Sequence, residues 1–152
     1  MDEYDNPWTY RGEQFDPTGL EDQVGFVYLI TNLTDGRMYV GQKKLWSHKF
    51  RVKRFKNGKK GRERIVIPSD WQKYYGSSEE LKTDVVSLGS SNFKREVLKV
   101  CKTKGIMNYE ELREQVLRDV LRDENYYNSY IGGRVHRSHV REEDTEGYPT
   151  LG

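Results

Sequence analysis

The chain has 152 residues, of which 33% are charged and 34% hydrophobic, and its formal net charge is +2. This length fits one domain, and no apolar run approaches the ~20 residues that a membrane-spanning helix needs. The acidic start lacks the apolar segment of a secretory signal, and the single cysteine, Cys101, excludes an internal disulfide and a cysteine zinc site. We therefore expect one domain in a reducing cytoplasm, with no membrane partner.

The first 23 residues are predicted to form an irregular extension without catalytic residues. Two prolines and two glycines interrupt this segment, and it sustains no helical or strand periodicity. Its aromatic residues could pack the extension against the domain: Trp8, Tyr10 and Phe15.

A β-hairpin is predicted next. Two runs of β-branched and aromatic residues, 26–32 and 37–41, flank Asp35-Gly36. Asp-Gly favours a two-residue type I′ turn, in which both residues have positive φ. Alternation along the first strand places Phe26, Tyr28 and Ile30 on one face, with Val27 and Leu29 on the other.

A strongly basic segment follows the hairpin. Residues 43–64 hold eleven Lys or Arg side chains against one acid, Glu63. Residues 47–64 have too few periodic apolar residues for a core element, and residues 56–61 (KNGKKG) indicate an exposed turn. A basic run can be a solvated face, but it also attracts phosphate backbones by releasing condensed counterions. We expect DNA contacts from Lys44, Lys53, Arg54, Lys59 and Lys60.

The second half of the chain predicts two helices and further strands. Residues 65–67 could form a short edge strand. Ser78 is expected to cap a helix that ends at Gly89, and residues 93–101 read as another strand. A second helix is expected from Asn108 to about Leu121, with an apolar stripe that includes Leu117 and Leu121.

The hairpin contains two tripeptides, FVY at 26–28 and YVG at 39–41, whose tyrosines stand eleven positions apart. This pattern resembles the GIY-YIG nuclease family, which is named for two such tripeptides on adjacent strands. Residues 125–133 (NYYNSYIGG) resemble the family's YYN segment. Residues 70–78 (DWQKYYGSS) resemble a segment of phage-encoded members.

The resemblance implies an α+β fold, with a small, mainly antiparallel three-stranded sheet flanked by helices. The nuclease domain would span residues 24–133, with residues 43–64 as a basic insertion and residues 134–152 as a basic, then acidic, tail. The implied activity is that of a metal-dependent DNA endonuclease using Mg²⁺ or Mn²⁺. A phage-encoded or homing-like enzyme, acting in the host cytoplasm, is consistent with the resemblance.

The resemblance also assigns roles to individual residues. Tyr28 would act as general base or position the attacking water, and Tyr39 would pack beside it. A phenol needs a neighbouring cation to ionise near pH 7, and we expect the Lys43/Lys44 pair to supply one to Tyr28. Two further residues complete the set: Gly41, leaving room for DNA, and Asn128, orienting a catalytic side chain or the phosphate.

The metal is assigned to a glutamate of the second helix. Glu114 and Glu111 rank almost equally as the metal ligand, and Glu110 ranks behind them. Glu114 and Glu110 flank the expected apolar stripe, whereas Glu111 sits among apolar neighbours as the family's acid does. Helix periodicity does not choose among the three.

The family's arginine has no direct counterpart in this chain. In the family it lies on a helix after the YIG strand, but the position eight residues past Gly41 is Lys49, preceded by His48. We expect Lys43, Lys44, Lys49 or Arg51 to take the phosphate-binding role, although Lys cannot bind a phosphate bidentately as Arg does.

Aromatic and C-terminal residues supply further candidates. We interpret Trp71 and Tyr74 as core, whereas Tyr75 could stack on bases or touch phosphate. The C-terminal contacts expected with DNA are from Arg134, His136 and Arg137.

Two rival interpretations stay open. The chain could be a non-catalytic nucleic-acid-binding module on the same fold, which the missing Arg supports, or a structural domain whose basic loop is incidental. A chain this short has no room for a separate DNA-binding domain, so specificity would come from the basic insertion, the C-terminal segment or a homodimer.

Overall fold

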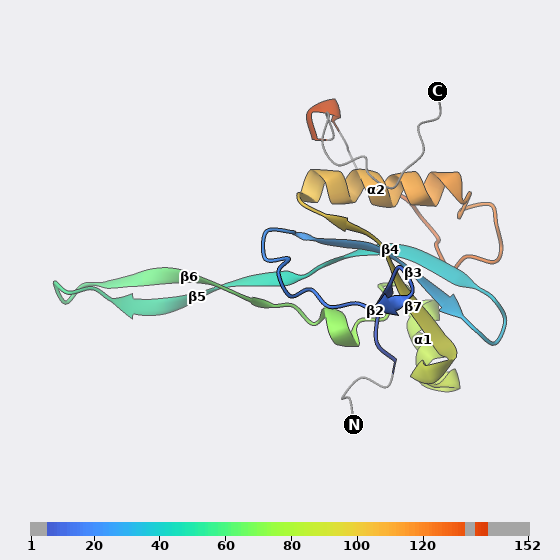
Figure 1. Cartoon of the computed structure of the whole chain (residues 1–152), viewed down its shortest axis with the longest axis horizontal. Helices are drawn as coiled ribbons and strands as arrows, with labels where there is room; N and C mark the ends of the chain where they lie inside the picture. The colour runs from blue at the N-terminus through green and yellow to red at the C-terminus, as the bar shows by residue number, and fades with distance from the viewer. Residues whose placement is uncertain (1–5, 133–135, 140–152) are drawn as a thin grey trace.

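The domain is built on a five-stranded mixed sheet in the order β2-β1-β7-β3-β4 (Figure 1). The computed structural model describes residues 6–132 and 136–139. Within the sheet, β1 and β7 are parallel and the other neighbours antiparallel. The α+β class is confirmed, but the three-stranded sheet is wrong because two N-terminal strands extend it. Its strands are β1 (Thr9–Tyr10), β2 (Glu13–Gln14), β3 (Gly25–Asn32), β4 (Met38–Lys44) and β7 (Phe93–Cys101).

The predicted hairpin is the pair β3 and β4, with Tyr28 opposite Gly41. The predicted turn is wrong, because only Gly36 of the Asp-Gly pair has a positive φ, of 82°. The loop instead spans residues 33–36, and Gly36 N–H donates to the Asn32 carbonyl at 2.7 Å. The Asn32 side chain stabilises this wider loop by accepting the Thr34 N–H at 2.9 Å.

Two helices cover opposite faces of the sheet (Figure 1). Helix α1 (Glu79–Leu88) packs Leu81 against the face that carries Phe26, Tyr28 and Ile30. Helix α2 (Lys104–Leu117) covers the face that carries Val27 and Leu29. The predicted strand alternation is therefore confirmed. So is the Ser78 cap of α1, whose Oγ accepts the Leu81 N–H at 3.2 Å.

Helix α2 differs from its prediction at both ends. It begins at Lys104 because the Thr103 hydroxyl caps it, accepting the Ile106 N–H at 3.1 Å. The expected start at Asn108 therefore lies inside the helix. The expected stripe is wrong too, since Leu117 and Leu121 are more than half exposed. The earlier start turns Ile106 and Met107, rather than the leucines, toward the sheet.

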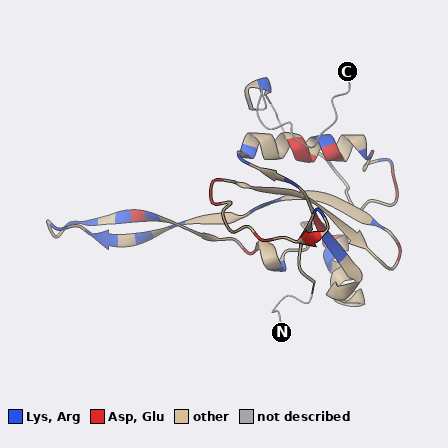
Figure 2. Ribbon diagram, in the orientation of Figure 1, with Lys and Arg blue, Asp and Glu red and all other residues tan. Residues whose placement is uncertain are grey.

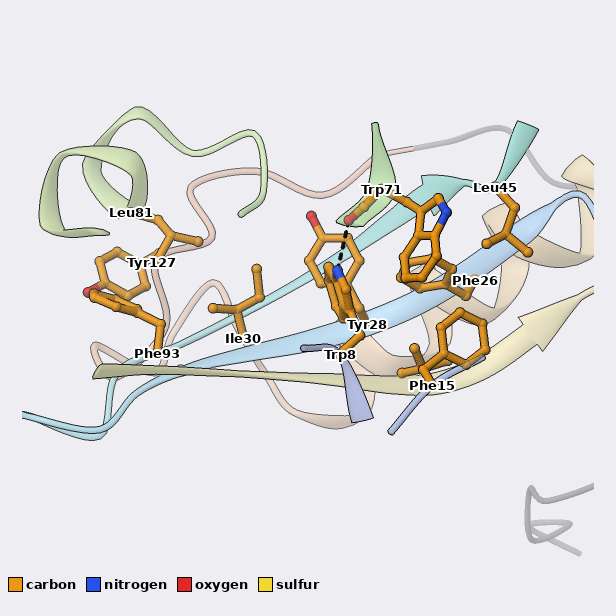
Figure 3. Close-up of a cluster of buried hydrophobic side chains, with 11 residues drawn as sticks. Trp8, Phe15, Phe26, Tyr28, Ile30, Leu45, Trp71, Leu81, Phe93 and Tyr127 are labelled. Atoms are coloured by element: carbon orange, nitrogen blue, oxygen red, sulfur yellow. Dashed lines mark hydrogen bonds between the residues drawn. The ribbon is translucent and has the colours of Figure 1, made fainter. Parts of the chain in front are cut away.

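The N-terminal segment is part of the core rather than an irregular extension (Figure 3). Trp8 is 1% exposed, and its Nε1 donates to the Trp71 carbonyl at 2.8 Å. Phe15 packs edge-on against Phe26 and Trp71. Trp71 is buried, as predicted, in the short 3₁₀ helix η1 (Trp71–Lys73), while Tyr74 is partly buried at the rim of the same cluster.

The basic insertion forms a two-stranded antiparallel ribbon that extends away from the sheet (Figure 1). Its strands are β5 (Trp46–Arg54) and β6 (Lys60–Pro68), joined by a turn at residues 55–59. The prediction that residues 47–64 form no core element is confirmed, and residues 65–67 do lie in a strand, whereas Leu45 of the predicted insertion 43–64 is buried in the core. The helix that the resemblance places after YVG is absent from the described chain, because β5 takes its position.

Two 3₁₀ helices complete the described elements, η2 (Ser90–Asn92) before β7 and η3 (Arg137–His139) near the C-terminus. None of the helices within residues 6–132 and 136–139 has the length and hydropathy needed to cross a membrane.

Candidate active site

The candidate site lies at the open edge of β4, the last strand of the sheet. A cleft of about 250 Å³ is present there, which we call the edge cleft. Its walls come from β4, the turn before α1, helix α2 and the segment after residue 126. They are Tyr39, Ser77, Ser78, Glu111, Gln115 and residues 127–132.

Asn128 closes the edge of β4 beside this cleft. Among the described residues no full strand follows β4, although Met38 forms an isolated bridge with Tyr126, so the other outward backbone groups of β4 need partners. Val40 N–H donates to Asn128 Oδ1 at 3.0 Å, and Asn128 Nδ2 donates to the Val40 carbonyl at 2.8 Å. Asn128 thus reaches the predicted site, where it positions the backbone between Tyr39 and Gly41.

Glu111 is the acid that α2 brings to the edge cleft. Gln42, which follows Gly41 on β4, donates through Nε2 to Glu111 Oε1 at 3.0 Å and to Asn108 Oδ1 at 2.9 Å. Burial raises the pKa of the Glu111 carboxyl. Gln42 therefore orients the carboxylate, a role that sequence reasoning missed although the residue directly follows the YVG motif.

The other two candidate acids face elsewhere. Glu114 Oε1 accepts from Arg118 Nε at 3.1 Å, one turn along α2, and does not line the edge cleft. Glu110 is 3% exposed and does not line it either. The structure thus separates Glu111 from Glu114, which sequence analysis ranked together.

Gly41 makes space for Tyr28 within the sheet. A Cβ at position 41 would overlap the Tyr28 hydroxyl and lie 3.0 Å from the Tyr39 ring. The space beside Gly41 is therefore filled by a phenol and is not open for DNA as expected. This is why the strand position opposite Tyr28 requires glycine.

Tyr28 is held in its protonated form. Its side chain is 1% exposed, and burial raises its pKa well above the ordinary value, with Tyr74 and Tyr39 adding to the effect. The expected stabilisation of a Tyr28 phenolate by lysines is wrong. Lys43 Nζ instead pairs with Asp70 Oδ1 at 2.5 Å and lies 4.2 Å from the centre of the Tyr74 ring.

Tyr39 is the phenol that lines the edge cleft. Its hydroxyl shares a 2.7 Å hydrogen bond with Ser77 Oγ. Burial raises its pKa, and the nearby Glu111 carboxylate raises it further. Tyr28 and Tyr39 lie with ring centres 6.2 Å apart, so the two phenols and Glu111 are brought together as the resemblance implied.

A buried cation, Arg95, supports the site from β7. Its Nη1 donates to the carbonyls of Gln72 at 2.7 Å and Tyr74 at 2.9 Å, and its guanidinium lies over the rings of Trp8 and Tyr75. Burial lowers its pKa to about 10, so it remains charged at neutral pH. Arg95 stands at an inward position of an alternating strand, and this was the signal for its burial.

The same contacts decide the place of Tyr75. Its ring packs beneath the Arg95 guanidinium at 4.2 Å and is partly buried against the core. Tyr75 therefore helps to hold the η1 segment in place. One face of its ring, which was expected to be open for stacking on bases, is covered by Arg95.

The candidates for the family's arginine separate into two groups. Lys43, Lys44 and His48 line a second cleft, where the ribbon joins the sheet. We call it the junction cleft; Gln42 also lines it and links it to Glu111. Lys49 and Arg51 are exposed on the ribbon outside both clefts, and Arg51 pairs with Glu63 at 2.9 Å.

The remaining DNA-contact candidates are exposed or lie outside the described residues. Lys53, Arg54, Lys59 and Lys60 are exposed on the ribbon and its turn. His136 and Arg137 are exposed near the C-terminus, where His136 Nδ1 bonds Ser138 Oγ at 2.8 Å. Arg134 and residues 140–152 lie outside the described residues.

The edge cleft offers oxygen ligands suited to a hard cation. The described residues contain no group of three His, Cys, Asp or Glu side chains that could enclose a metal. They do place Glu111 beside Gln115, whose buried Oε1 has no hydrogen-bond partner among them. Mg²⁺ is commonly held by one or two carboxylates with water and substrate phosphate filling its shell, so these donors fit it.

Comparison with known proteins identifies the family. The chain matches the family model described as "Putative endonuclease segE, GIY-YIG domain" over residues 8–131. No curated relative and no solved structure matches it. The family model covers the hairpin, the ribbon, both helices and the Asn128 segment, which together make up most of the chain. The chain therefore belongs to the SegE-type GIY-YIG endonuclease-domain family.

Proposed function

We propose that this protein is a metal-dependent endonuclease that hydrolyses DNA phosphodiester bonds at the edge cleft. The observation that carries the proposal is the placement of Glu111 and Tyr39 in the edge cleft, with Tyr28 packed beside Tyr39, in a chain of this family. These groups come from α2 and from two strands, so only the folded domain brings them together.

Glu111 is the proposed ligand of Mg²⁺ or Mn²⁺. A divalent cation there would polarise the phosphate and stabilise the negative charge on the leaving 3′ oxygen. The protein's own part is to aim the carboxylate through the hydrogen bond from Gln42, which offsets part of the rise in pKa that burial causes. Gln115 Oε1 is placed to accept a hydrogen bond from a water of the metal's shell.

The tyrosines are proposed to position the attacking water. Because burial raises the pKa values of Tyr28 and Tyr39, both phenols are protonated at neutral pH and are poor proton acceptors. Tyr39, held by Ser77, can direct the water by a hydrogen bond. In hydrolysis the water oxygen forms the new P–O bond and gives up one proton to the solvent, the bond to the 3′ oxygen breaks, and that oxygen takes one proton from the solvent.

DNA is proposed to continue from the edge cleft into the junction cleft. Lys43 and Lys44 line the junction cleft, and Gln42 joins it to Glu111. A phosphate next to the one that is cut would meet these lysines, which replace the family's bidentate arginine with point charges. They offset the negative charge of the backbone without fixing the phosphate's orientation.

One observation favours a binding module without catalysis. Among the described residues, no Arg or Lys lines the edge cleft itself. Transition-state charge there would rest on the cation alone. The same experiment therefore decides between an enzyme and a binding module.

The test is plasmid nicking with Mg²⁺ or Mn²⁺, comparing Glu111→Gln with Glu114→Gln as a matched control on the same helix. Loss of several kcal/mol of charge stabilisation predicts a fall in cleavage rate of about 10²-fold or more for Glu111→Gln and little change for Glu114→Gln. Cleavage that persists in Glu111→Gln would overturn the metal assignment. No cleavage by the wild type with any divalent cation would favour the binding module.

A further inference from the structure

The β5–β6 ribbon has two unlike faces. Residues directly opposite one another in an antiparallel pair project to the same side, and successive residues alternate. The observed register pairs Phe50 with Arg64, Val52 with Arg62 and Arg54 with Lys60. We call the side that these six residues share the cationic face.

The cationic face contains no acidic residue within the described ribbon, 46–68. Its four cations alternate with large apolar side chains that remain exposed, with Phe50 57% and Val52 73% exposed. Arg62 lies over the Phe50 ring at 4.4 Å, which keeps its guanidinium on this side of the ribbon. Charged and apolar groups are thus presented together to an outside partner.

The opposite face is partly neutralised. It pairs Lys49 with Ile65, Arg51 with Glu63 and Lys53 with Gly61. Glu63 accepts from Arg51 at 2.9 Å and lies 3.9 Å from Lys53, so the one acid of the ribbon serves two of this face's three cations. Figure 2 shows this acid as the red segment within the blue of the ribbon.

The cationic face leads directly into the junction cleft. His48 is on the same side of β5, opposite Val66, and lines that cleft with Lys43. Arg64 Nε donates to His48 Nδ1 at 3.2 Å, which connects the cations of the ribbon to the base of the cleft. A DNA strand leaving the edge cleft would therefore meet the cationic face.

We propose that the cationic face lies in the major groove of duplex DNA and that the opposite face points away from it. This inference rests on the proposed function for its substrate. The major groove admits a two-stranded β-ribbon, and nine paired residues at 3.3 Å each give a ribbon of about 30 Å, close to one turn of DNA. The cations would meet phosphates along the groove walls, and Phe50 and Val52 would touch base edges such as thymine methyl groups.

The positive charge of the cationic face favours DNA, rather than a second copy of this chain, as its partner. Two cationic faces brought together would place like charges opposite one another without an acid between them. Phosphates supply the opposite sign, and their counterions are released when the arginines bind.

The first test measures affinity for a 30-base-pair duplex in EDTA, so that cleavage plays no part. Arg62→Ala/Arg64→Ala removes two cations from the cationic face, and Lys49→Ala/Lys53→Ala removes two from the opposite face. We expect the first pair to weaken binding at least tenfold and to lower the salt dependence by about two counterions, and the second pair to weaken it less than threefold. Equal losses, or a greater loss for the second pair, would overturn the proposal.

The second test places the ribbon in a groove. Bulky substituents at C5 of every pyrimidine fill the major groove and leave the minor groove open. Such a duplex should bind the wild type at least tenfold more weakly than the plain duplex, and the Arg62/Arg64 variant should scarcely distinguish the two. Equal binding of both duplexes by the wild type, or dimerisation through the ribbon without DNA in sedimentation, would overturn the proposal.

Failure here is separable from failure of the proposed nuclease. A protein that cuts plasmid but binds equally well after either pair of substitutions keeps its enzyme assignment and loses the groove assignment. A protein that shows the asymmetry between faces but never cuts keeps the groove assignment alone.

Discussion

The edge cleft and the β5–β6 ribbon differ in how their charged and titratable groups are held. In the cleft, few charges are held by many contacts, and burial moves the pKa values of Tyr28, Tyr39 and Glu111. On the ribbon, many charges are exposed and few are paired. The difference teaches that chemistry needs fixed, desolvated groups, whereas attraction to a polyanion needs exposed charge on a separate arm.

Removing the ribbon should have the largest effect, because it separates DNA attraction by the ribbon from the folding of the sheet that carries the cleft. Leu45 and Ser69 are already joined by a 2.8 Å backbone hydrogen bond, so an Asn-Gly turn can replace residues 47–67 between the paired Trp46 and Pro68. We expect duplex affinity to fall by about 10²-fold or more, because all four cations of the cationic face are lost. Fluorescence anisotropy measures the affinity. A midpoint of thermal unfolding within a few degrees of the wild type would show that the sheet folds without the ribbon.

Gly41→Ala should damage the cleft without touching the ribbon. The new Cβ would overlap the Tyr28 hydroxyl, and such overpacking costs about 1–3 kcal/mol of folding free energy. Denaturant unfolding measures the loss, and nicking activity should fall as Tyr28 and Tyr39 shift. Gly132→Ala is the matched control for stability alone, because a Cβ there has nothing within 4 Å although the residue lines the cleft. A stable, active Gly41→Ala variant would show that the packing around Tyr28 is looser than described.

Asn128→Ala tests the closure of the sheet edge. It leaves the Val40 N–H without its partner and the Val40 carbonyl with only the 3.4 Å hydrogen bond from Gln115 Nε2, which costs about 1–3 kcal/mol. Amide hydrogen exchange at Val40 should accelerate, while affinity for DNA through the ribbon stays near that of the wild type. Unchanged exchange would argue that the segment after Tyr126 holds β4 without this side chain.

The smallest effect is expected from the titration of Glu111. Because burial raises its pKa, the folded state favours the protonated form, and the stability this gives is complete below about pH 4.5 and is lost as pH rises through the raised value. Glu111→Gln stays neutral, so its midpoint of thermal unfolding should exceed that of the wild type at pH 7.5. The gap should close below pH 4.5. A wild type that is the more stable at pH 7.5 would contradict the assigned environment.

The hairpin and α1 could be predicted because their signals are local. Alternation fixed the faces of β3, and a serine and a glycine marked the ends of α1. The start of α2 was missed because Asn108 was taken as the cap, whereas the residue that caps the helix is Thr103. The five-stranded sheet was missed because β1 has only two residues, and its pairing with β7 joins residues that are 87 positions apart.

The sequence identified the residues of the site better than it predicted what each of them does. Motif spacing supplied Tyr28, Tyr39 and Asn128, but sequence could not rank Glu111 above Glu114, since that choice depends on Gln42 reaching across from β4. The expected phenolate failed for a related reason. Lys43 is close to the tyrosine motif in the sequence, but the sequence does not show that Asp70 pairs with Lys43 in the fold and neutralises its charge.

The two hydrogen bonds between the Asn128 side chain and the Val40 backbone have a consequence for how this chain behaves at high concentration. A side-chain amide that donates and accepts as a peptide group does occupies the edge of β4 without lengthening the sheet. Together with the backbone hydrogen bonds between Met38 and residues 125–127, it engages two successive outward positions of β4, which opposes pairing with another copy, the usual start of aggregation through sheet edges. The same amide that shapes the cleft therefore also protects part of this edge of the sheet.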